Sequence, residues 1–389
     1  MTTPRLTDDQ RRARLGSRHL LAPAHRVTAV EEVADALVGL HSSDPATVYL
    51  SACARLVEPS TAEVERGLYE DVTLVKLLSM RRTIFAVSSG LAPYVNASTA
   101  RAIAAKERAT FLKRLREGAT GDWDERSLAR TEREVLEALT ARGEATVAEL
   151  GKDIPALRET IVTAAGKPYE SRSSLGSRLL RLLASDGHVR RARPRGSWTS
   201  SMYAYAPVAQ LPELPVREAK AEVARRWLAS FGPATEADLK WWTGWTLGDT
   251  RRALADVGAR EVRITEGTGL VLPDDLEEAA PVEPWAALLP GLDPTAMGWR
   301  GRDWYLSPEH VPFLFDRAGN IGPTVWWNGR IVGGWAQRAN GEIVWRALED
   351  VSKKAASAIA AEAARLSGWL GGVRVTPRFR TPLERDLVR

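Results

Sequence analysis

Side chains suited to metal, redox or phosphate-transfer chemistry are sparse in this sequence. The chain has five histidines and one cysteine, Cys53. The histidines lack the spacing of metal ligands, there is no Cys-x-x-Cys or His-x-Glu, and a lone cysteine forms neither a zinc cluster nor an internal disulfide. No glycine-rich loop has P-loop spacing. We therefore expect a protein that uses neither a metal nor another cofactor.

One short segment, Gly39-Leu-His-Ser-Ser-Asp-Pro45, gathers polar side chains between two expected helices. A free imidazole such as that of His41 titrates near pH 6.5, at about neutrality. Structural roles also fit, because Asp44 before a proline has the form of a helix N-cap. Ser42 and Ser43 are ordinary turn residues, and His41 at a helix end can interact with the helix dipole. Both kinds of role stay open at this point.

Arginines gather in two expected hairpins. Residues 172–195 contain seven arginines and one acid, Asp186, with Trp198, Tyr203 and Tyr205 alongside. Basic groups neutralise phosphate, and aromatic rings stack on bases or pack beneath the hairpin. A solvated basic hairpin is the structural alternative. The residues that we expect to contact DNA are Arg81, Arg82, Arg172, Arg178, Arg190, Arg191, Arg193 and Arg195.

The hydrophobic pattern predicts the same order of elements three times, with helices followed by a β-hairpin. This order is typical of a winged-helix unit, whose third helix or hairpin contacts DNA. Repeated units in one chain can enclose a duplex without a dimer. The expected helices and hairpins are 30–40, 46–56, 61–70 and 74–87; then 128–142, 146–150, 174–185 and 188–207; then 218–230, 235–242, 247–257 and 261–272.

The remaining sequence predicts a small sheet at 285–345, a long helix at 351–369 and a last edge strand at 373–382, since Pro377 does not suit a central strand. The fold class is therefore α+β and mostly helical, with three tandem winged-helix modules and a C-terminal sheet with a long helix. The expected divisions are 1–96, a linking helix at 97–126, 127–210, 211–280 and 281–389.

The composition is that of a globular protein and not of a disordered or membrane one. The chain has 389 residues, 44% hydrophobic and 26% charged, with a net charge of +5. Only nine of its 54 basic residues are lysine, and twelve of its 14 tryptophans lie from Trp227 onward. We expect these late tryptophans to pack in the core. No apolar stretch of signal-peptide or membrane-spanning type is present, so we expect a cytoplasmic protein.

Four motifs occur in order along nearly the whole chain: Gly39–Pro45, Ser79-Met-Arg-Arg-Thr-Ile-Phe85, Leu289-Pro-Gly-Leu-Asp293 and Asn328-Gly-Arg-Ile-Val-Gly-Gly-Trp335. Together they resemble the AlkZ/YcaQ-like DNA glycosylases. The resemblance implies tandem winged-helix units and removal of bulky N7-alkylated or crosslinked guanine from DNA.

The family's Gln–hydrophobic–Gln signature aligns with His41-Ser42-Ser43, so both glutamines are absent here. The resemblance implies that these positions place the attacking water. An N7-alkylguanine is already cationic, so its departure needs no proton. A neutral His41 could hold and deprotonate the water, and Asp44 could stabilise a positive sugar. The candidate catalytic residues are therefore His41, Ser43 and Asp44.

We expect a monomer that binds double-stranded DNA and hydrolyses the N-glycosidic bond of an alkylated purine. One alternative is a non-catalytic winged-helix protein, a regulator or a lesion binder, that lacks the Gln signature. Another is an interaction protein whose hairpins contact other proteins. Formation of alkali-labile abasic sites distinguishes the first hypothesis from the other two.

Overall fold

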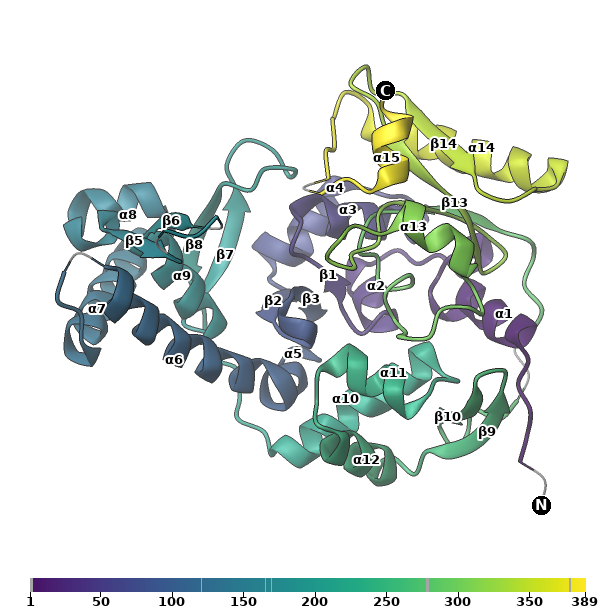
Figure 1. The fold of residues 1–389 in the computed structure, drawn as a ribbon, viewed down its shortest axis with the longest axis horizontal. Coiled ribbons are helices and arrows are strands. Elements are labelled where there is room, and N and C mark those ends of the chain that lie inside the picture. Colours follow the sequence, from purple (N-terminus) through teal and green to yellow (C-terminus); the bar gives the residue numbers. More distant parts are fainter. Residues whose placement is uncertain (1–2, 120, 165, 169, 278–279, 378) are drawn as a thin grey trace.

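A computed structural model describes residues 3–119, 121–164, 166–168, 170–277, 280–377 and 379–389 (Figure 1). The expected α+β class is confirmed, since helices carry most of the regular structure and the described strands form five small antiparallel sheets. Figure 1 shows the N-terminal elements (purple) at the centre, with the later parts of the chain placed around them. No helix of the described residues combines the length and the apolar character that crossing a membrane requires.

The first unit places His41 on a short strand beside a hairpin. Its three-stranded sheet has the order β1-β3-β2. Gly39 turns the chain into β1 with φ +111°, and a Cβ there would lie 2.8 Å from Cγ1 of Val87. Glycine is therefore the residue that this close turn requires. The elements are α1 (Asp8–Arg18), α2 (Val30–Ala36), β1 (Leu40–His41), α3 (Pro45–Cys53), α4 (Thr61–Glu65), β2 (Leu74–Leu78) and β3 (Ile84–Ser88).

The second unit follows a linking segment that includes a long helix, and its main sheet has the order β4-β8-β7. The expected helices and hairpin are present. A second hairpin, β5–β6, lies between the second and third helices and was not predicted from the sequence. α5 (Ala92–Val95) ends the first unit, and α6 (Arg101–Gly118) is the long helix of the linking segment. The elements of the second unit are α7 (Glu125–Arg142), β4 (Ala145–Thr146), α8 (Val147–Asp153), β5 (Thr160–Thr163), β6 (Ser171–Ser174), α9 (Leu175–Ser185), β7 (Val189–Pro194) and β8 (Tyr203–Pro207).

The third unit again has three helices and a hairpin. Ala234 forms an isolated antiparallel bridge with Leu270, so a short extended segment pairs with the second hairpin strand, as β1 and β4 do in the other two units. The elements are α10 (Val216–Phe231), α11 (Glu236–Thr243), α12 (Leu247–Asp256), β9 (Arg260–Ile264) and β10 (Gly267–Val271).

The C-terminal part contains the expected sheet, of order β11-β12-β13-β14, and the expected long helix. The expected edge strand at 373–382 is wrong: residues 373–377 and 379–381 are not in a strand, and a helix begins at Pro382. Residue 378 lies outside the described residues. The backbone N–H of Val375 donates to Oε1 of Gln337, 2.8 Å away, and so binds a side chain instead of a neighbouring strand. The elements are β11 (Ala286–Leu289), α13 (Val311–Leu314), β12 (Thr324–Trp327), β13 (Arg330–Gln337), β14 (Ile343–Ala347), α14 (Lys353–Leu370) and α15 (Pro382–Leu387).

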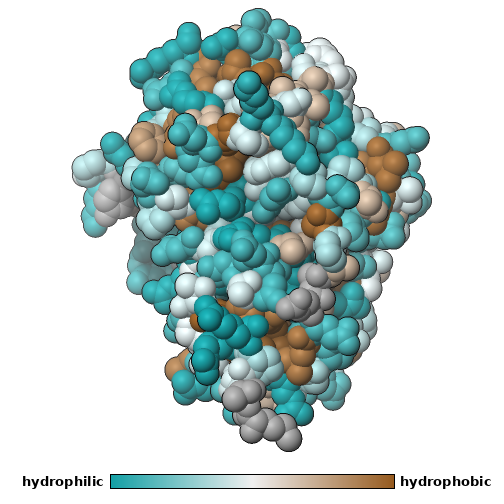
Figure 2. All heavy atoms as spheres, turned by 90° about the vertical axis from the view of Figure 1, so that its right-hand side faces the viewer, coloured by the Kyte–Doolittle hydropathy of each residue, from teal (hydrophilic) through white to brown (hydrophobic). Residues whose placement is uncertain are grey.

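Most of the late tryptophans are buried, as expected. Seven of them lie in one hydrophobic core that the first unit, the third unit and the C-terminal part share, whereas the second unit has a core of its own. Phe231 contacts both Trp227 and Trp299, with ring centroids 5.7 and 5.1 Å away. On the face shown in Figure 2, hydrophobic residues lie in separate groups among hydrophilic ones. This face therefore lacks one continuous apolar surface. The buried late tryptophans are Trp227, Trp242, Trp245, Trp285, Trp299, Trp304, Trp326 and Trp335.

Candidate functional site

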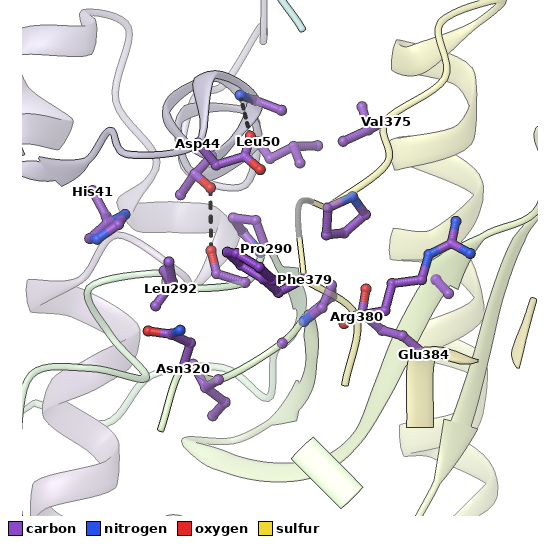
Figure 3. A pocket seen from close by; sticks show the side chains of 18 of the residues that line it. His41, Asp44, Leu50, Pro290, Leu292, Asn320, Val375, Phe379, Arg380 and Glu384 are labelled. Carbon is purple, nitrogen blue, oxygen red and sulfur yellow. Dashed lines mark hydrogen bonds between the residues drawn. The ribbon is translucent and has the colours of Figure 1, made fainter. Parts of the chain in front are cut away.

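A cavity of about 220 Å³ lies between the first unit and the C-terminal part of the chain. Figure 3 shows His41 and Asp44 entering from N-terminal elements, and Phe379, Arg380 and Glu384 from C-terminal ones. The cavity brings together all three candidate catalytic residues. Its described lining residues are His41, Ser43, Asp44, Ala46, Thr47, Leu50, Thr83, Pro290, Gly291, Leu292, Asn320, Ile321, Gly322, Pro323, Trp335, Ala336, Gln337, Val375, Pro377, Phe379, Arg380, Glu384 and Val388.

His41 forms part of the cavity wall as a neutral imidazole. Strand pairing places it opposite Phe85, and the two rings meet edge to face with centroids 5.4 Å apart. The residue is only 2% exposed. Burial, and secondarily the charge of Arg81, lowers its pKa to about 3. Its buried Nδ1 has no hydrogen-bond partner among the described residues, so the ring can still bind a water or a ligand.

Asp44 is a helix N-cap, as the structural alternative predicts. Its carboxylate accepts a hydrogen bond from the backbone N–H of Ala46 at 3.0 Å, and a proline follows at the first helical position. Ser43 Oγ accepts a hydrogen bond from the backbone N–H of Ile84 at 3.2 Å. Both side chains therefore have local structural roles, and both also line the cavity.

A buried ion pair holds the loop that forms another wall of the cavity. Arg55 and Asp293 are fully buried and make two hydrogen bonds of 2.7 and 2.9 Å. Ser51 Oγ donates to the same carboxylate at 2.6 Å. Burial alone would raise the pKa of Asp293, but Arg55 and these hydrogen bonds lower it overall. The loop that contains Gly291 is thereby anchored to α3.

The remaining wall comes from the C-terminal segment. Burial raises the pKa of Glu384 to about 7. One carboxylate oxygen of Glu384 accepts hydrogen bonds from the backbone N–H and Oγ1 of Thr381 at 2.9 and 3.1 Å. Arg380 and the exposed ring of Phe379 complete this side. These residues were not predicted from the sequence, because nothing in their local pattern indicates that they lie near His41.

None of the eight arginines expected to contact DNA lines this cavity. Arg81 is half-buried, with its guanidinium 4.1 Å from the ring centroid of Trp241 and within 3.4 Å of the carbonyl oxygen of Met297. Arg82 is exposed and pairs with Glu107.

One arginine of the second hairpin, Arg193, connects it to the first unit. Arg193 pairs with Glu65 and Glu70 of the first unit, at 2.5 and 2.7 Å, and Arg191 lies 4.8 Å from the ring centroid of Tyr203. Three other expected arginines have partners within the second unit: Arg172 pairs with Glu170, Arg195 pairs with Glu144, and Arg178 donates a hydrogen bond to Ser173. The buried Nη1 of Arg190 has no hydrogen-bond partner among the described residues.

Trp198 lies in the loop between β7 and β8 and is packed against other rings. Its ring centroid is 4.8 Å from that of Tyr49 and 5.7 Å from that of Trp369. This indole therefore joins the second unit to α3 and α14, and it is not a free surface for stacking bases.

The cavity suits a reaction of an organic cation with water. It combines a neutral imidazole, the carboxyl groups of Asp44 and Glu384, and apolar walls. Carboxylates stabilise positive charge that develops in a transition state. Across the part of the chain that the structure describes, no three His, Cys, Asp or Glu side chains come together as a possible metal site.

Residues 34–369 match the model of the family described as DNA glycosylase AlkZ-like. A relative from Streptomyces sahachiroi, named interstrand DNA cross-link repair glycosylase, is 28% identical over 386 residues that cover 93% of this chain and 96% of the relative. The solved structure of Streptomyces sahachiroi DNA glycosylase AlkZ is similar, with a TM-score of 0.69 and 23% identity. That likeness covers 94% of this chain and 97% of the other, and it supports the fold.

Proposed function

The chain belongs to the AlkZ-like family of DNA glycosylases, and from this premise we propose that it releases N7-alkylated or crosslinked purines from duplex DNA. Such enzymes hydrolyse N-glycosidic bonds. The relative named for interstrand cross-link repair supports bulky adducts as the substrate class. The observation that carries the proposal is the buried, neutral His41 with an unpartnered ring nitrogen at a cavity beside Asp44.

In the proposed reaction the C1′–N9 bond breaks first. Its electron pair moves to the cationic base, which leaves as a neutral molecule without taking up a proton. Water then bonds to C1′ of the oxocarbenium-like sugar and loses a proton, which leaves an abasic site. Because the sugar is strongly electrophilic, orienting the water matters more than the strength of the base.

His41 holds this water in the proposed mechanism. A neutral imidazole nitrogen accepts a hydrogen bond from water and receives its proton as the bond to C1′ forms. The low pKa of His41, about 3, keeps the ring neutral at physiological pH. Asp44 provides negative charge to the sugar, and Ser43 helps to orient the water.

Duplex binding in this proposal uses three winged-helix modules, assigned to 1–96, 127–210 and 211–280, with the helix of 97–126 as a link and 281–389 as a separate C-terminal part. The repeated strand order supports this assignment. The backbone contacts are those of the eight arginines named from the sequence. Exposed ion pairs such as those of Arg82, Arg172, Arg193 and Arg195 are weak enough for a phosphate to replace the carboxylate. The protein acts as a cytoplasmic monomer.

One observation favours a non-catalytic DNA-binding protein as the second candidate. His41-Ser42-Ser43 departs from the Gln signature of the family, and the His41 ring is almost wholly buried. Such a protein would bind the lesion and leave its glycosidic bond intact.

The test measures abasic sites in duplexes that carry N7-methylguanine or an interstrand crosslink. We expect alkali-labile breaks with the wild-type protein, a rate at least about 100-fold lower for His41→Ala, and an unchanged rate for His25→Ala, which replaces an exposed histidine that does not line the cavity. Tight binding without breaks would favour the non-catalytic protein.

A further inference from the structure

A second cavity, of about 320 Å³, lies among α6, α9 and the β5–β6 hairpin, with the end of β2 at its edge. It shares none of its described lining residues with the His41 cavity. The residues that line it are Leu78, Glu107, Phe111, Arg114, Ser171, Ser173, Arg178, Arg181, Leu182 and Ser185.

Helical and strand periodicity directs one set of side chains into this space. On α6, Phe111 and Arg114 are three residues apart, and on α9 Arg178 and Arg181 have the same spacing, which places each pair on one helix face. Ser171 and Ser173 alternate along β6 and so point to the same face of the hairpin. Phe111 and Leu182 are buried, so the polar groups lie above an apolar floor.

Three cations converge at this cavity without a compensating acid. Among the described residues, no ion pair joins Arg114, Arg178 or Arg181 to a carboxylate, and the lining acid Glu107 already pairs with Arg82. Burial, and secondarily the charges of Arg181 and Arg114, lowers the pKa of Arg178. Arg178 is half-buried, whereas Arg114 and Arg181 are exposed. Their like charges repel one another, and a bound anion would relieve this repulsion.

Neutral hydrogen bonds hold part of this cluster in place. Nε of Arg178 donates to Oγ of Ser173, and Nη2 donates to Oγ1 of Thr163 at 3.3 Å. Nε of Arg181 donates to the carbonyl oxygen of Ser177 at 2.9 Å. The guanidinium groups are thus oriented by neutral partners, which leaves their charge uncompensated.

Guanidinium and serine hydroxyl groups are frequent ligands of phosphate oxygens, and phosphate contacts set the position of a protein on DNA. The third helix of a winged-helix unit is also the element that approaches DNA. We propose that Arg114, Arg178 and Arg181 form a binding site for a phosphodiester of the DNA strand. This inference rests on the proposed function, and it adds Arg114 and Arg181 to the residues expected from the sequence.

The test measures how affinity for an undamaged duplex depends on salt, by fluorescence anisotropy over a range of KCl concentrations. Each phosphate contact adds about 0.9 to the slope of log K against log salt concentration. We expect Arg114→Gln to lower the slope by about 0.9 and the affinity at low salt by about tenfold. The double variant Arg178→Gln/Arg181→Gln is expected to do the same or more.

A matched control is Arg130→Gln/Arg133→Gln, which removes two exposed arginines from α7 outside the cavity. Its slope should fall less than that of Arg114→Gln, with circular dichroism confirming that all variants are folded. Arg114→Gln is the most informative variant, because the Arg114 side chain makes no hydrogen bond among the described residues and its replacement should leave the fold unchanged.

Three results would overturn the inference. The first is a wild-type slope and affinity in Arg114→Gln, and the second is a wild-type protein that does not bind duplex DNA. The third is a pair of observations: inorganic phosphate stabilises the wild type but not Arg114→Gln, and the two proteins have equal salt slopes for duplex binding. This pair would show that the site binds a free anion only. Duplex binding with the expected slopes but without abasic sites would refute glycosylase activity and leave this site supported.

Discussion

The low pKa of His41 leads to a specific pH dependence for base release. At an ordinary pKa of about 6.5, the neutral fraction of a histidine falls about 25-fold between pH 7 and pH 5. With the pKa at about 3, the ring of His41 stays neutral throughout this range. We therefore expect the His41-dependent rate to change by less than about twofold from pH 7 to pH 5.

Glu384 also titrates in this interval, since its pKa is about 7 and it lines the same cavity. The assay is therefore single-turnover release of N7-methylguanine by wild type, by Glu384→Gln and by His41→Ala. Enzyme-free duplex corrects for release by acid alone. Any pH dependence that Glu384→Gln abolishes belongs to the carboxyl group and not to the imidazole.

One result would refute the reasoning about His41. It is a fall of about 25-fold, with a midpoint near pH 6.5, that persists in Glu384→Gln and disappears in His41→Ala. Such a profile would mean that the imidazole is hydrated and titrates normally, and that burial does not keep it neutral.

Three further predictions concern side chains around the cavity. Asp44→Asn keeps an equally good N-cap, so stability should change by less than about 0.5 kcal/mol, while loss of the charge should slow base release by about 30-fold or more, as single-turnover kinetics will show. Asp293→Asn leaves the buried Arg55 unpaired and should lower the free energy of unfolding by about 3–5 kcal/mol in urea titrations. The folded-state pKa of Glu384 is raised to about 7. Its protonated carboxyl group therefore contributes fully to the stability of the fold below about pH 4.5, and this contribution is lost as the pH rises through 7. Glu384→Gln should therefore be more stable than wild type at pH 8, by up to about 3 kcal/mol, and equal free energies of unfolding for the two proteins at pH 8 would contradict this.

Local sequence patterns predicted most of the elements, because helical periodicity and turn residues act over short distances. They missed the β5–β6 hairpin, since Ser171–Ser174 has none of the β-branched or aromatic residues typical of strands. They also predicted a strand near Val375, where a side-chain hydrogen bond replaces backbone pairing. The first difference is one of local composition, and the second comes from a contact between residues distant in sequence.

The candidate site was predictable in part for the same reason. His41, Ser43 and Asp44 are adjacent in sequence, and the motif that ends at Asp293 marked the loop opposite them. Arg380 and Glu384 reach the cavity from more than 330 residues away, through packing of the C-terminal segment against the sheet. The packing of the Arg81 side chain on Trp241 was likewise not predictable from the sequence, and its contact with DNA stays a prediction.

The movement of charge in the proposed reaction explains why a largely apolar cavity with the carboxylate of Asp44 in its wall suits it. The substrate base is cationic before cleavage, the positive charge passes to the sugar in the transition state, and the released base is neutral. The carboxylate of Asp44 therefore attracts the substrate and the transition state, and it loses this attraction to the product. A protonated His41 would repel both the cationic substrate and the positive sugar of the transition state. The burial that keeps His41 neutral is thus as necessary to the proposed chemistry as the carboxylate beside it.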